Sequence, residues 1–197
     1  METEIVPSTE RTVDQVVEAW LHVTQLRDHE TEGHSLRVTS LSLKLAAIFG
    51  MSERDMISLR RGALLHDIGK LAVPEAIVYK PAPLTLDEFK TMRKHPIFGY
   101  EMLNKVDALK DAALVARFHH EMWDGSGYPD GLIGEQTPLS ARIVALVEVW
   151  DALRSDHIYR RAWTYDKARD YILEQSGKAF DPKIVEHFLP MVVPNLG

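Results

Sequence analysis

Apolar residues recur along most of the chain at the three-to-four spacing that gathers them on one face of a helix. Within residues 11–27 the apolar positions are Val13, Val16, Val17, Trp20, Leu21 and Val23. Because this spacing matches the helical period, residues 11–27 are predicted to form an amphipathic helix. The same kind of pattern predicts a chain that is helical almost throughout.

Residues that begin or end helices divide the rest of the chain into segments. Ser52 with Asp55 suits an N-terminal cap and Gly69 suits a stop, so a helix is predicted from about 53 to 67. Thr85, followed by two acidic residues, is predicted to start a short helix. The other predicted helices run from Glu30 to Phe49, from Pro96 onward, from Asp111 to His119 and His120, and over about 139–154, 164–176 and 181–192.

Two stretches are predicted to be irregular. Residues 70–84 hold three prolines, and residues 121–137 form the longest loop, which is rich in glycine. No alternating apolar pattern predicts a strand, and no internal repeat is visible. The predicted fold class is all-α, a single-domain helical bundle over residues 11–197 that follows a flexible N-terminal segment of residues 1–10.

The composition narrows the class of protein. The chain has 197 residues, of which 45% are hydrophobic, enough for one domain with a core. The net charge of −6 argues against a basic surface for nucleic acid. Bound metal cations can still attract an anionic substrate. The lack of cysteine excludes disulfides, thiolate metal sites and cysteine nucleophiles.

The N-terminal sequence METEIVPSTE is acidic and polar, unlike the start of a signal peptide. No uninterrupted apolar run is long enough to span a bilayer. The protein is therefore expected to be cytoplasmic, with neither a membrane nor a nucleic acid polymer as a partner.

Nine histidines in a chain without cysteine leave imidazole and carboxylate as the strong ligands for transition metals. Glu30 and His34 lie four residues apart, so one helix face carries both. His66 and Asp67 end an apolar helix, where a buried carboxylate needs a cation or a metal ion. His95 lies at a break between two helices.

His119 and His120 are adjacent at the end of a predicted helix. Neighbouring helical residues diverge by about 100°, so the two imidazoles are expected to reach different ions. Glu148 lies in a strongly apolar helix, where a carboxylate is unfavourable unless it is paired. Asp151 follows three residues later, and we interpret it as a hydrogen-bonded structural acid, with metal ligation as the alternative.

These eight candidate ligands, without Asp151, suit Fe, Mn, Zn or Ni better than Mg or Ca. Two or three ions about 4 Å apart are typical of phosphoester hydrolysis, because they hold the phosphate and activate water at neutral pH.

Two motifs resemble the signatures of a known family. HDIGK at 66–70 and HHEMWDGSGYP at 119–129 look like those of the HD-GYP domain, a branch of the HD phosphohydrolases. Weaker similarities extend the resemblance to about residues 25–190: ETEGHSLRV at 30–38, MRKHPIFGYEML at 92–103 and FDP at 180–182.

The resemblance implies a helical bundle that holds two or three divalent metal ions, frequently iron or manganese. It also implies hydrolysis of the bacterial second messenger cyclic di-GMP to linear pGpG and onward to GMP. Asp67 would bridge two ions, and a glutamate at position 30 resembles the subset with a third metal. The implied metal ligands are Glu30, His34, His66, Asp67, His95, His119, His120 and Glu148.

The same resemblance assigns substrate contacts. Lys70 matches a lysine that contacts the scissile phosphate and is a candidate proton donor, although a surface lysine after a helix stop is the alternative. Arg160 matches a residue that binds a nucleotide phosphate. Tyr128 is expected to stack on a guanine, to shape a partner surface, or simply to pack. Glu121 is expected to orient a neighbour rather than to catalyse.

Two positions depart from the family pattern. Glu148 stands where an aspartate is usual, and its extra methylene changes the reach of the carboxylate. His157 and Ile158 stand where Arg-Pro is usual. The change removes a bidentate phosphate contact, and a histidine replaces the charge only when it is protonated.

These departures leave three hypotheses. The first is a cyclic di-GMP phosphodiesterase. The second is a phosphodiesterase of another cyclic dinucleotide such as cyclic GMP-AMP, and the third is a sensor or interaction module that binds metal or nucleotide without useful turnover. The resemblance also implies an upstream sensory or receiver domain and diguanylate cyclases as partners. The helix at 11–27 is expected to pack on its own bundle, with a homodimer contact as the alternative.

Overall fold

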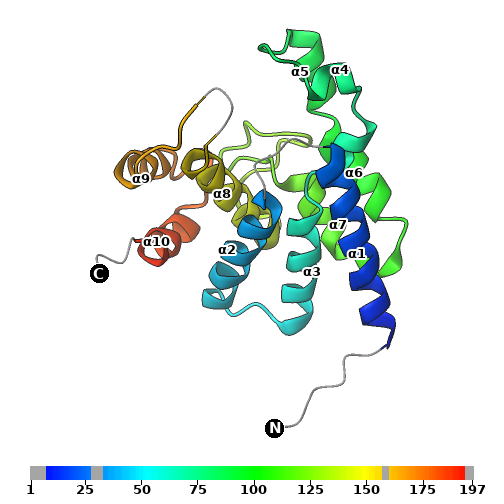
Figure 1. Cartoon of the computed structure of the whole chain (residues 1–197). Coiled ribbons are helices and arrows are strands. Elements are labelled where there is room, and N and C mark those ends of the chain that lie inside the picture. Colours follow the sequence, from blue (N-terminus) through cyan, green and yellow to red (C-terminus); the bar gives the residue numbers. More distant parts are fainter. Residues whose placement is uncertain (1–7, 28–32, 157–159, 194–197) are drawn as a thin grey trace.

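The computed structural model describes residues 8–27, 33–156 and 160–193 of the chain (Figure 1). Within these ranges the regular structure is helical and no strand occurs, so the all-α prediction is confirmed. The α-helices are α1 (Ser8–Arg27), α2 (His34–Ile48), α3 (Glu53–Leu64), α4 (Glu75–Val78), α5 (Leu86–Met92), α6 (His95–Leu103), α7 (Lys110–Phe118), α8 (Leu139–Arg154), α9 (Tyr165–Glu174) and α10 (Pro182–Met191). Short 3-10 helices are η1 (Ile68–Ala72), η2 (Asp107–Leu109) and η3 (Gly134–Gln136).

Local caps start the helices where the sequence predicts them. The Ser52 hydroxyl accepts a hydrogen bond from the Asp55 amide at the start of α3. Thr85 and Glu88 form a reciprocal capping box at the start of α5. Both caps satisfy backbone amides that lack a partner within the helix, and both predicted helix starts are confirmed.

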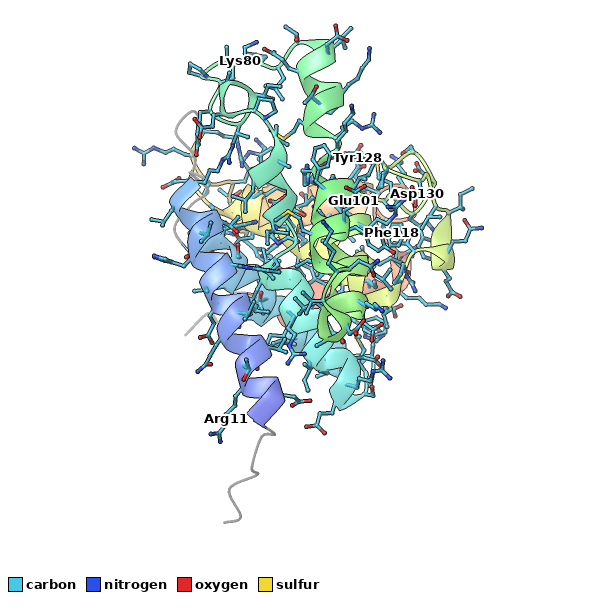
Figure 2. All side chains as sticks on the ribbon, turned by 90° about the vertical axis from the view of Figure 1, so that its right-hand side faces the viewer. Arg11, Lys80, Glu101, Phe118, Tyr128 and Asp130 are labelled. Atoms are coloured by element: carbon cyan, nitrogen blue, oxygen red, sulfur yellow. The ribbon has the colours of Figure 1, made fainter. Side chains whose placement is uncertain are left out.

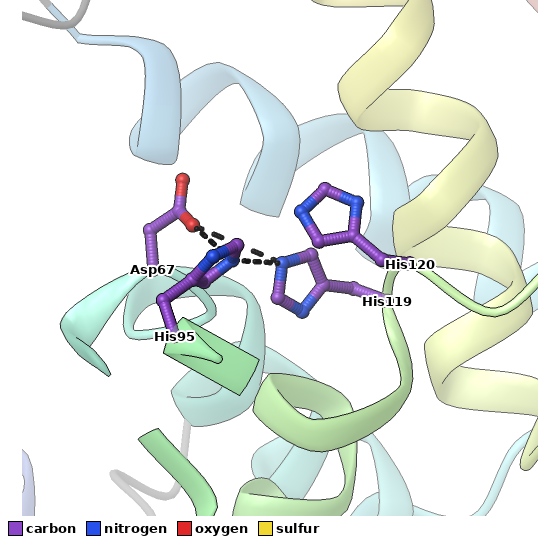
Figure 3. A group of neighbouring side chains, drawn as sticks. All are labelled: Asp67, His95, His119 and His120. Atoms are coloured by element: carbon purple, nitrogen blue, oxygen red, sulfur yellow. Dashed lines mark hydrogen bonds and ion pairs between the residues drawn. The ribbon is translucent and has the colours of Figure 1, made fainter. Parts of the chain in front are cut away.

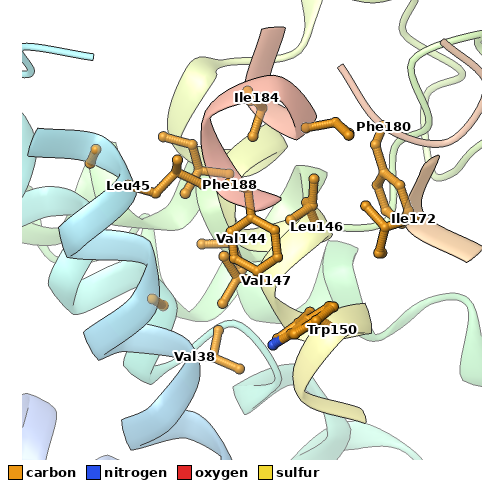
Figure 4. Close-up of a cluster of buried hydrophobic side chains, with 14 of the residues drawn as sticks. Val38, Leu45, Val144, Leu146, Val147, Trp150, Ile172, Phe180, Ile184 and Phe188 are labelled. Atoms are coloured by element: carbon orange, nitrogen blue, oxygen red, sulfur yellow. The ribbon is translucent and has the colours of Figure 1, made fainter. Parts of the chain in front are cut away.

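Helix α8 is the central element of the larger apolar core (Figure 4). Its residues Val144, Val147 and Trp150 lie between α2 and the C-terminal helices α9 and α10, and the Trp150 ring meets Phe188 edge-on with centroids 5.4 Å apart. A second apolar cluster joins α1, the end of α3, η1, α6 and α7. The predicted metal ligands that the structure describes come from elements of both clusters or directly follow them, so packing of the two halves fixes their relative positions.

Helix α3 ends at Leu64, so the prediction of a helix as far as residue 67 is wrong. The His66 side chain donates Nδ1–H to the Ala63 carbonyl at 2.8 Å, which is the carbonyl that the Asp67 amide would reach in a continuing helix. The chain then turns into η1. His66 and Asp67 therefore lie in a turn between two helices.

Three other predicted boundaries are corrected. Helix α2 begins at His34 and not at Glu30, because Gly33 adopts the left-handed backbone conformation with φ 76°. Helix α7 ends at Phe118, before the two histidines. The stretch 70–84 is not wholly irregular, since it contains α4.

Gly69 allows η1 to lie directly against α6. A Cβ atom at this position would lie 1.9 Å from the His95 carbonyl oxygen and 2.5 Å from the Gly99 amide nitrogen, distances that no side chain tolerates. The contact brings the turn that carries Asp67 against the start of α6, which carries His95.

The loop at 121–137 is organised by one buried carboxylate. Glu121 is 4% exposed and accepts hydrogen bonds from the backbone amides of Asp130, Gly131 and Leu132, at 2.7, 3.2 and 3.0 Å. These contacts match the expectation that Glu121 orients its neighbours.

The Gly69→Ala variant is expected to lower the free energy of unfolding by about 1–3 kcal/mol, because the added methyl overlaps α6 backbone. Denaturant unfolding measures the loss. Gly99→Ala is the matched control on the other side of the contact, since its Cβ would lie 3.4 Å from the Ala116 Cβ and the Gly69 amide nitrogen. Equal losses in the two variants would contradict the steric account.

The Glu121→Gln variant is expected to lower the free energy of unfolding by about 1–3 kcal/mol, because an amide NH₂ then faces backbone donors. Hydrogen exchange at residues 130–132 should also accelerate. Glu135→Gln in the same loop is the control, since the Glu135 and Lys183 side chains are both exposed in their 3.3 Å ion pair. A change within about 0.5 kcal/mol is expected there, and the same small change in Glu121→Gln would refute the anchoring role.

Candidate metal centre

The ends of three helices converge on one buried carboxylate (Figure 3). Asp67 follows α3, His95 is the first residue of α6, and His119 and His120 directly follow α7. Asp67, His95 and His119 are each at most 6% exposed. The site is therefore formed where helix termini meet between the two apolar clusters.

Three of the imidazoles are held by the same backbone contact. Each donates Nδ1–H to the carbonyl of the residue three positions earlier, and because a carbonyl can only accept, the proton must be on Nδ1. The pairs are His66 with Ala63 at 2.8 Å, His95 with Met92 at 2.8 Å, and His119 with Ala116 at 2.9 Å. In the neutral imidazole each Nε2 then carries a lone pair.

These Nε2 atoms surround the Asp67 carboxylate. His95 Nε2 lies 3.1 Å and His119 Nε2 3.8 Å from Asp67 Oδ1, while His66 Nε2 lies 3.3 Å from Oδ2. The Nε2 atoms of His95 and His119 are 3.3 Å apart. Several electron-rich atoms thus face one another in a buried space.

This donor set fits a metal cation. Asp67 Oδ1 is buried without a hydrogen-bond donor, and the lone pairs around it repel one another unless a positive charge lies between them. Two groups offer ligand atoms that all lie within 4.8 Å of one another, namely Asp67 with His95, His119 and His120, and Asp67 with His66 and Glu148. Asp67 belongs to both groups, and imidazole with carboxylate suits a transition metal.

Charge and burial keep the ligands in the protonation states that metals require. Burial alone would raise the pKa of Asp67, but the Lys70 ammonium, the largest opposing influence, holds this pKa well below its ordinary value. Burial, with repulsion from neighbouring histidines, lowers the pKa of His119 well below its usual range and also lowers that of His120. The carboxylate is thus ionised and both imidazoles are neutral at physiological pH.

The expected divergence of His119 and His120 is wrong. Their ring centroids are 4.1 Å apart and both belong to the same group of candidate ligands. Because α7 ends at Phe118, the two residues lie in a turn, where the angle between successive helical side chains does not apply.

His34 is oriented by Asp151. Its Nδ1 lies 2.7 Å from Asp151 Oδ2, and Arg37 donates to both oxygens of that carboxylate, at 2.7 and 2.9 Å. Although burial alone would raise the pKa of Asp151, hydrogen bonds from His34 and Arg37 lower it to about 2. Asp151 is therefore the predicted hydrogen-bonded acid. The His34 and His66 ring centroids are 5.7 Å apart, so His34 borders the cluster, and its role as a ligand stays a prediction.

The predicted substrate contacts have different surroundings. Lys70 Nζ lies 2.8 Å from Asp67 Oδ2, and its side chain is 20% exposed, so this lysine belongs to the site. Tyr128 stacks on His120 with centroids 4.8 Å apart and an angle of 27°. Arg160 instead donates to the carbonyls of Ala152 and Leu153 at the end of α8.

Glu30 and His157 lie outside the described residues.

Two arginines near the centre were not assigned a role from the sequence. Arg37 lies one helical turn after His34, a spacing that gives a signal for a shared helix face. Arg93 lies over the Tyr128 ring, and no local pattern indicates that contact. None of the described helices is long and apolar enough to cross a lipid bilayer.

Comparison with known proteins finds a matching family and similar phosphodiesterases. The model of the HD domain family matches residues 19–184. The chain is 43% identical over 167 residues to the cyclic di-GMP phosphodiesterase response regulator RpfG of Xanthomonas campestris, a match that covers 84% of this chain and 44% of that protein. It is 38% identical over 170 residues to the 3′3′-cGAMP-specific phosphodiesterase 2 of Vibrio cholerae, covering 85% and 33%. The chain therefore spans less than half the length of these two relatives.

A solved structure shares the fold. The crystal structure of the cyclic GMP-AMP specific phosphodiesterase V-cGAP3 of V. cholerae superposes with a TM-score of 0.69 at 19% identity, covering 91% of this chain and 49% of that one. Together with the complete HDIGK and HHEMWDGSGYP motifs, the match of the HD domain model over residues 19–184 shows that the chain belongs to the HD domain family, in its HD-GYP branch.

Proposed function

We propose that this chain is a metal-dependent phosphodiesterase that hydrolyses cyclic di-GMP to linear pGpG and onward to GMP. The observation that carries the proposal is the position of Asp67 within two groups of candidate ligands. Asp67 is suited to bridge two ions, and two neighbouring ions are typical of phosphoester hydrolysis. The similarity to a cyclic di-GMP phosphodiesterase supports this substrate.

The cofactors are two or three divalent ions, with iron or manganese the best fit to imidazole and carboxylate ligands and zinc or nickel as alternatives. The ions supply Lewis acidity and activate water at neutral pH. His66, Asp67 and Glu148 would hold one ion, and Asp67 with His95, His119 and His120 another. His34 with Glu30 would complete the third position.

Lys70 would bind and orient the scissile phosphate. Its ammonium contacts Asp67 Oδ2 at 2.8 Å, so its positive charge lies beside the carboxylate that would hold the ions and within reach of a phosphate bound there. The same ammonium is the candidate that delivers a proton to the leaving 3′ oxygen. Arg160 would bind a nucleotide phosphate after giving up its carbonyl contacts, and His157 would add charge when protonated.

A second candidate substrate is 3′3′-cyclic GMP-AMP. The similarity to a relative specific for that dinucleotide supports it, as does His157 in place of the usual arginine. The two dinucleotides differ in one base, so discrimination depends on base contacts and not on the metal ligands. A module that binds nucleotide without turnover is the third candidate.

We also propose a domain organisation and partners for the whole protein. Residues 11–197 would form the hydrolytic unit, which spans less than half of the two relatives described above. An upstream sensory or receiver domain would control it, diguanylate cyclases would be partners, and a homodimer is a candidate assembly.

The Asp67→Asn variant is expected to lower kcat/KM for cyclic di-GMP by at least about 100-fold, because the anionic ligand proposed to be shared by two ions is lost. The charge stabilisation that such ions give a transition state amounts to several kcal/mol. The assay follows pGpG and GMP by chromatography with manganese or iron under reducing conditions. Glu101→Gln is the matched control, since Glu101 is an exposed acid on α6 (Figure 2).

Unchanged turnover in Asp67→Asn would refute the phosphodiesterase proposal. The same assay with 3′3′-cyclic GMP-AMP ranks the two substrates by kcat/KM. Tight binding of wild-type protein with no product from either dinucleotide would favour the non-catalytic module.

The Glu148→Gln variant is expected to weaken Mn²⁺ affinity by about tenfold or more, because an amide oxygen replaces an anionic ligand. Glu148→Asp, which restores the usual family residue, is expected to bind Mn²⁺ within a few-fold of the wild type. Calorimetric titration of metal-depleted protein measures both. Equal Mn²⁺ affinity of wild type and Glu148→Gln would remove Glu148 from the ligand set.

A further inference from the structure

Arg93 lies at the border of the metal centre. It directly follows α5 and precedes the predicted ligand His95 by two residues. Its guanidinium carbon is 4.3 Å from the centroid of the Tyr128 ring, and that ring stacks on His120. Figure 2 shows Tyr128 directly below the part of the molecule that carries α5. One aromatic ring therefore separates Arg93 from a candidate metal ligand.

The backbone around Arg93 is fixed on both sides. The Arg93 amide donates to the Phe89 carbonyl at 2.9 Å and closes α5. The preceding carbonyl, that of Met92, accepts Nδ1–H of His95 at 2.8 Å. The hydrogen bond that orients a predicted ligand thus also determines where the Arg93 side chain begins.

Arg93 differs from the other arginines around the centre in its partners. Arg37 is bound to Asp151, Arg117 to Asp130, and Arg160 to α8 carbonyls. In the part of the chain that the structure describes, the contacts of the Arg93 guanidinium are with the Tyr128 and Phe89 rings, and no carboxylate lies within ion-pair distance. A cation–π contact orients a guanidinium while its N–H donors remain available to an anion.

The charges of the centre act on the same tyrosine. Burial raises the pKa of Tyr128 above its ordinary value, and Glu148 and Asp67 raise it further, while Arg93 and Lys70 oppose them. The Tyr128 hydroxyl is therefore neutral at physiological pH. The Tyr128 ring, which the Arg93 guanidinium covers and which stacks on His120, is therefore an uncharged contact between this cation and the centre.

We propose that Arg93 binds the phosphate of the cyclic dinucleotide that is not being cleaved. The inference rests on the proposed function, in which the metal ions and Lys70 would bind the scissile phosphate. A cyclic dinucleotide carries two anionic phosphates in one ring, so the second requires a cation at the border of the site. The planar guanidinium fork matches two phosphate oxygens, and the Tyr128 ring holds it in place before the ligand arrives. Arg93 thus supplies a guanidinium in a chain that has His157 where the family usually has arginine.

Binding of a cyclic di-GMP analogue tests the proposal without relying on turnover. The probe is the bis-phosphorothioate, which keeps both negative charges and resists hydrolysis. Its Kd for manganese-loaded protein is measured by calorimetry. Arg93→Gln is expected to raise this Kd about tenfold, equivalent to 1.4 kcal/mol for a charge-assisted contact.

Two further variants serve as controls. Lys94→Gln removes the same charge from the exposed neighbouring residue and is expected to keep Kd within twofold of the wild type. Arg93→Lys keeps the charge without the fork and is expected to raise Kd about threefold, which keeps the test valid should Arg93→Gln fold poorly.

The outcomes separate the two proposals. Wild-type Kd in both Arg93 variants would overturn the role of Arg93. Binding of the probe by wild-type protein without hydrolysis of cyclic di-GMP would overturn the phosphodiesterase. A higher Kd in Arg93→Gln would in that case still support the phosphate contact. A wild-type protein that neither binds the probe nor hydrolyses cyclic di-GMP would overturn both.

Discussion

The close approach of imidazole nitrogens to one buried carboxylate is the interaction on which the rest of the structure depends. Asp67 is buried where electrostatic interactions are strong, and its Oδ1 faces the lone pairs of His95 and His119. Such an arrangement is unfavourable by itself and becomes favourable around a divalent cation. The two apolar clusters hold the helix ends together against this repulsion, so hydrophobic packing far from the site supplies the free energy that keeps the ligands assembled.

The hydrogen bond from a histidine Nδ1–H to a backbone carbonyl both ends helices and orients the candidate metal ligands. At His66, the imidazole satisfies a carbonyl at the end of α3 and ends that helix. The bond fixes the ring orientation and leaves the other nitrogen for the metal. His119 makes the same hydrogen bond after α7, and the bond of His95 joins the end of α5 to the start of α6. Ligand geometry is thereby coupled to helix boundaries and not to side-chain rotamers alone.

Local signals predicted most of the helices, because the apolar period, the cap at Thr85 and the glycine-rich loop depend on neighbouring residues. The wrong predictions occur where a contact between residues distant in sequence, or the exact end of a helix, determines the local structure. The end of α3 depends on the His66 side chain, and the meeting of His119 with His120 depends on where α7 stops. The position of Arg93 depends on a tyrosine from a distant loop, so no pattern in the sequence indicates it.

The hydrogen bonds of Glu121 determine which substitutions the loop after the paired histidines tolerates. Glu121 binds the loop only through the backbone amides of residues 130–132. Every amino acid except proline offers that amide, so the hydrogen-bond pattern places no other demand on the side chains there. Leu132 can therefore change and alter the outer surface while the anchoring carboxylate stays fixed beside His120, whereas the φ of 69° at Gly131 and the ion pair of Asp130 with Arg117 restrict the two positions before it.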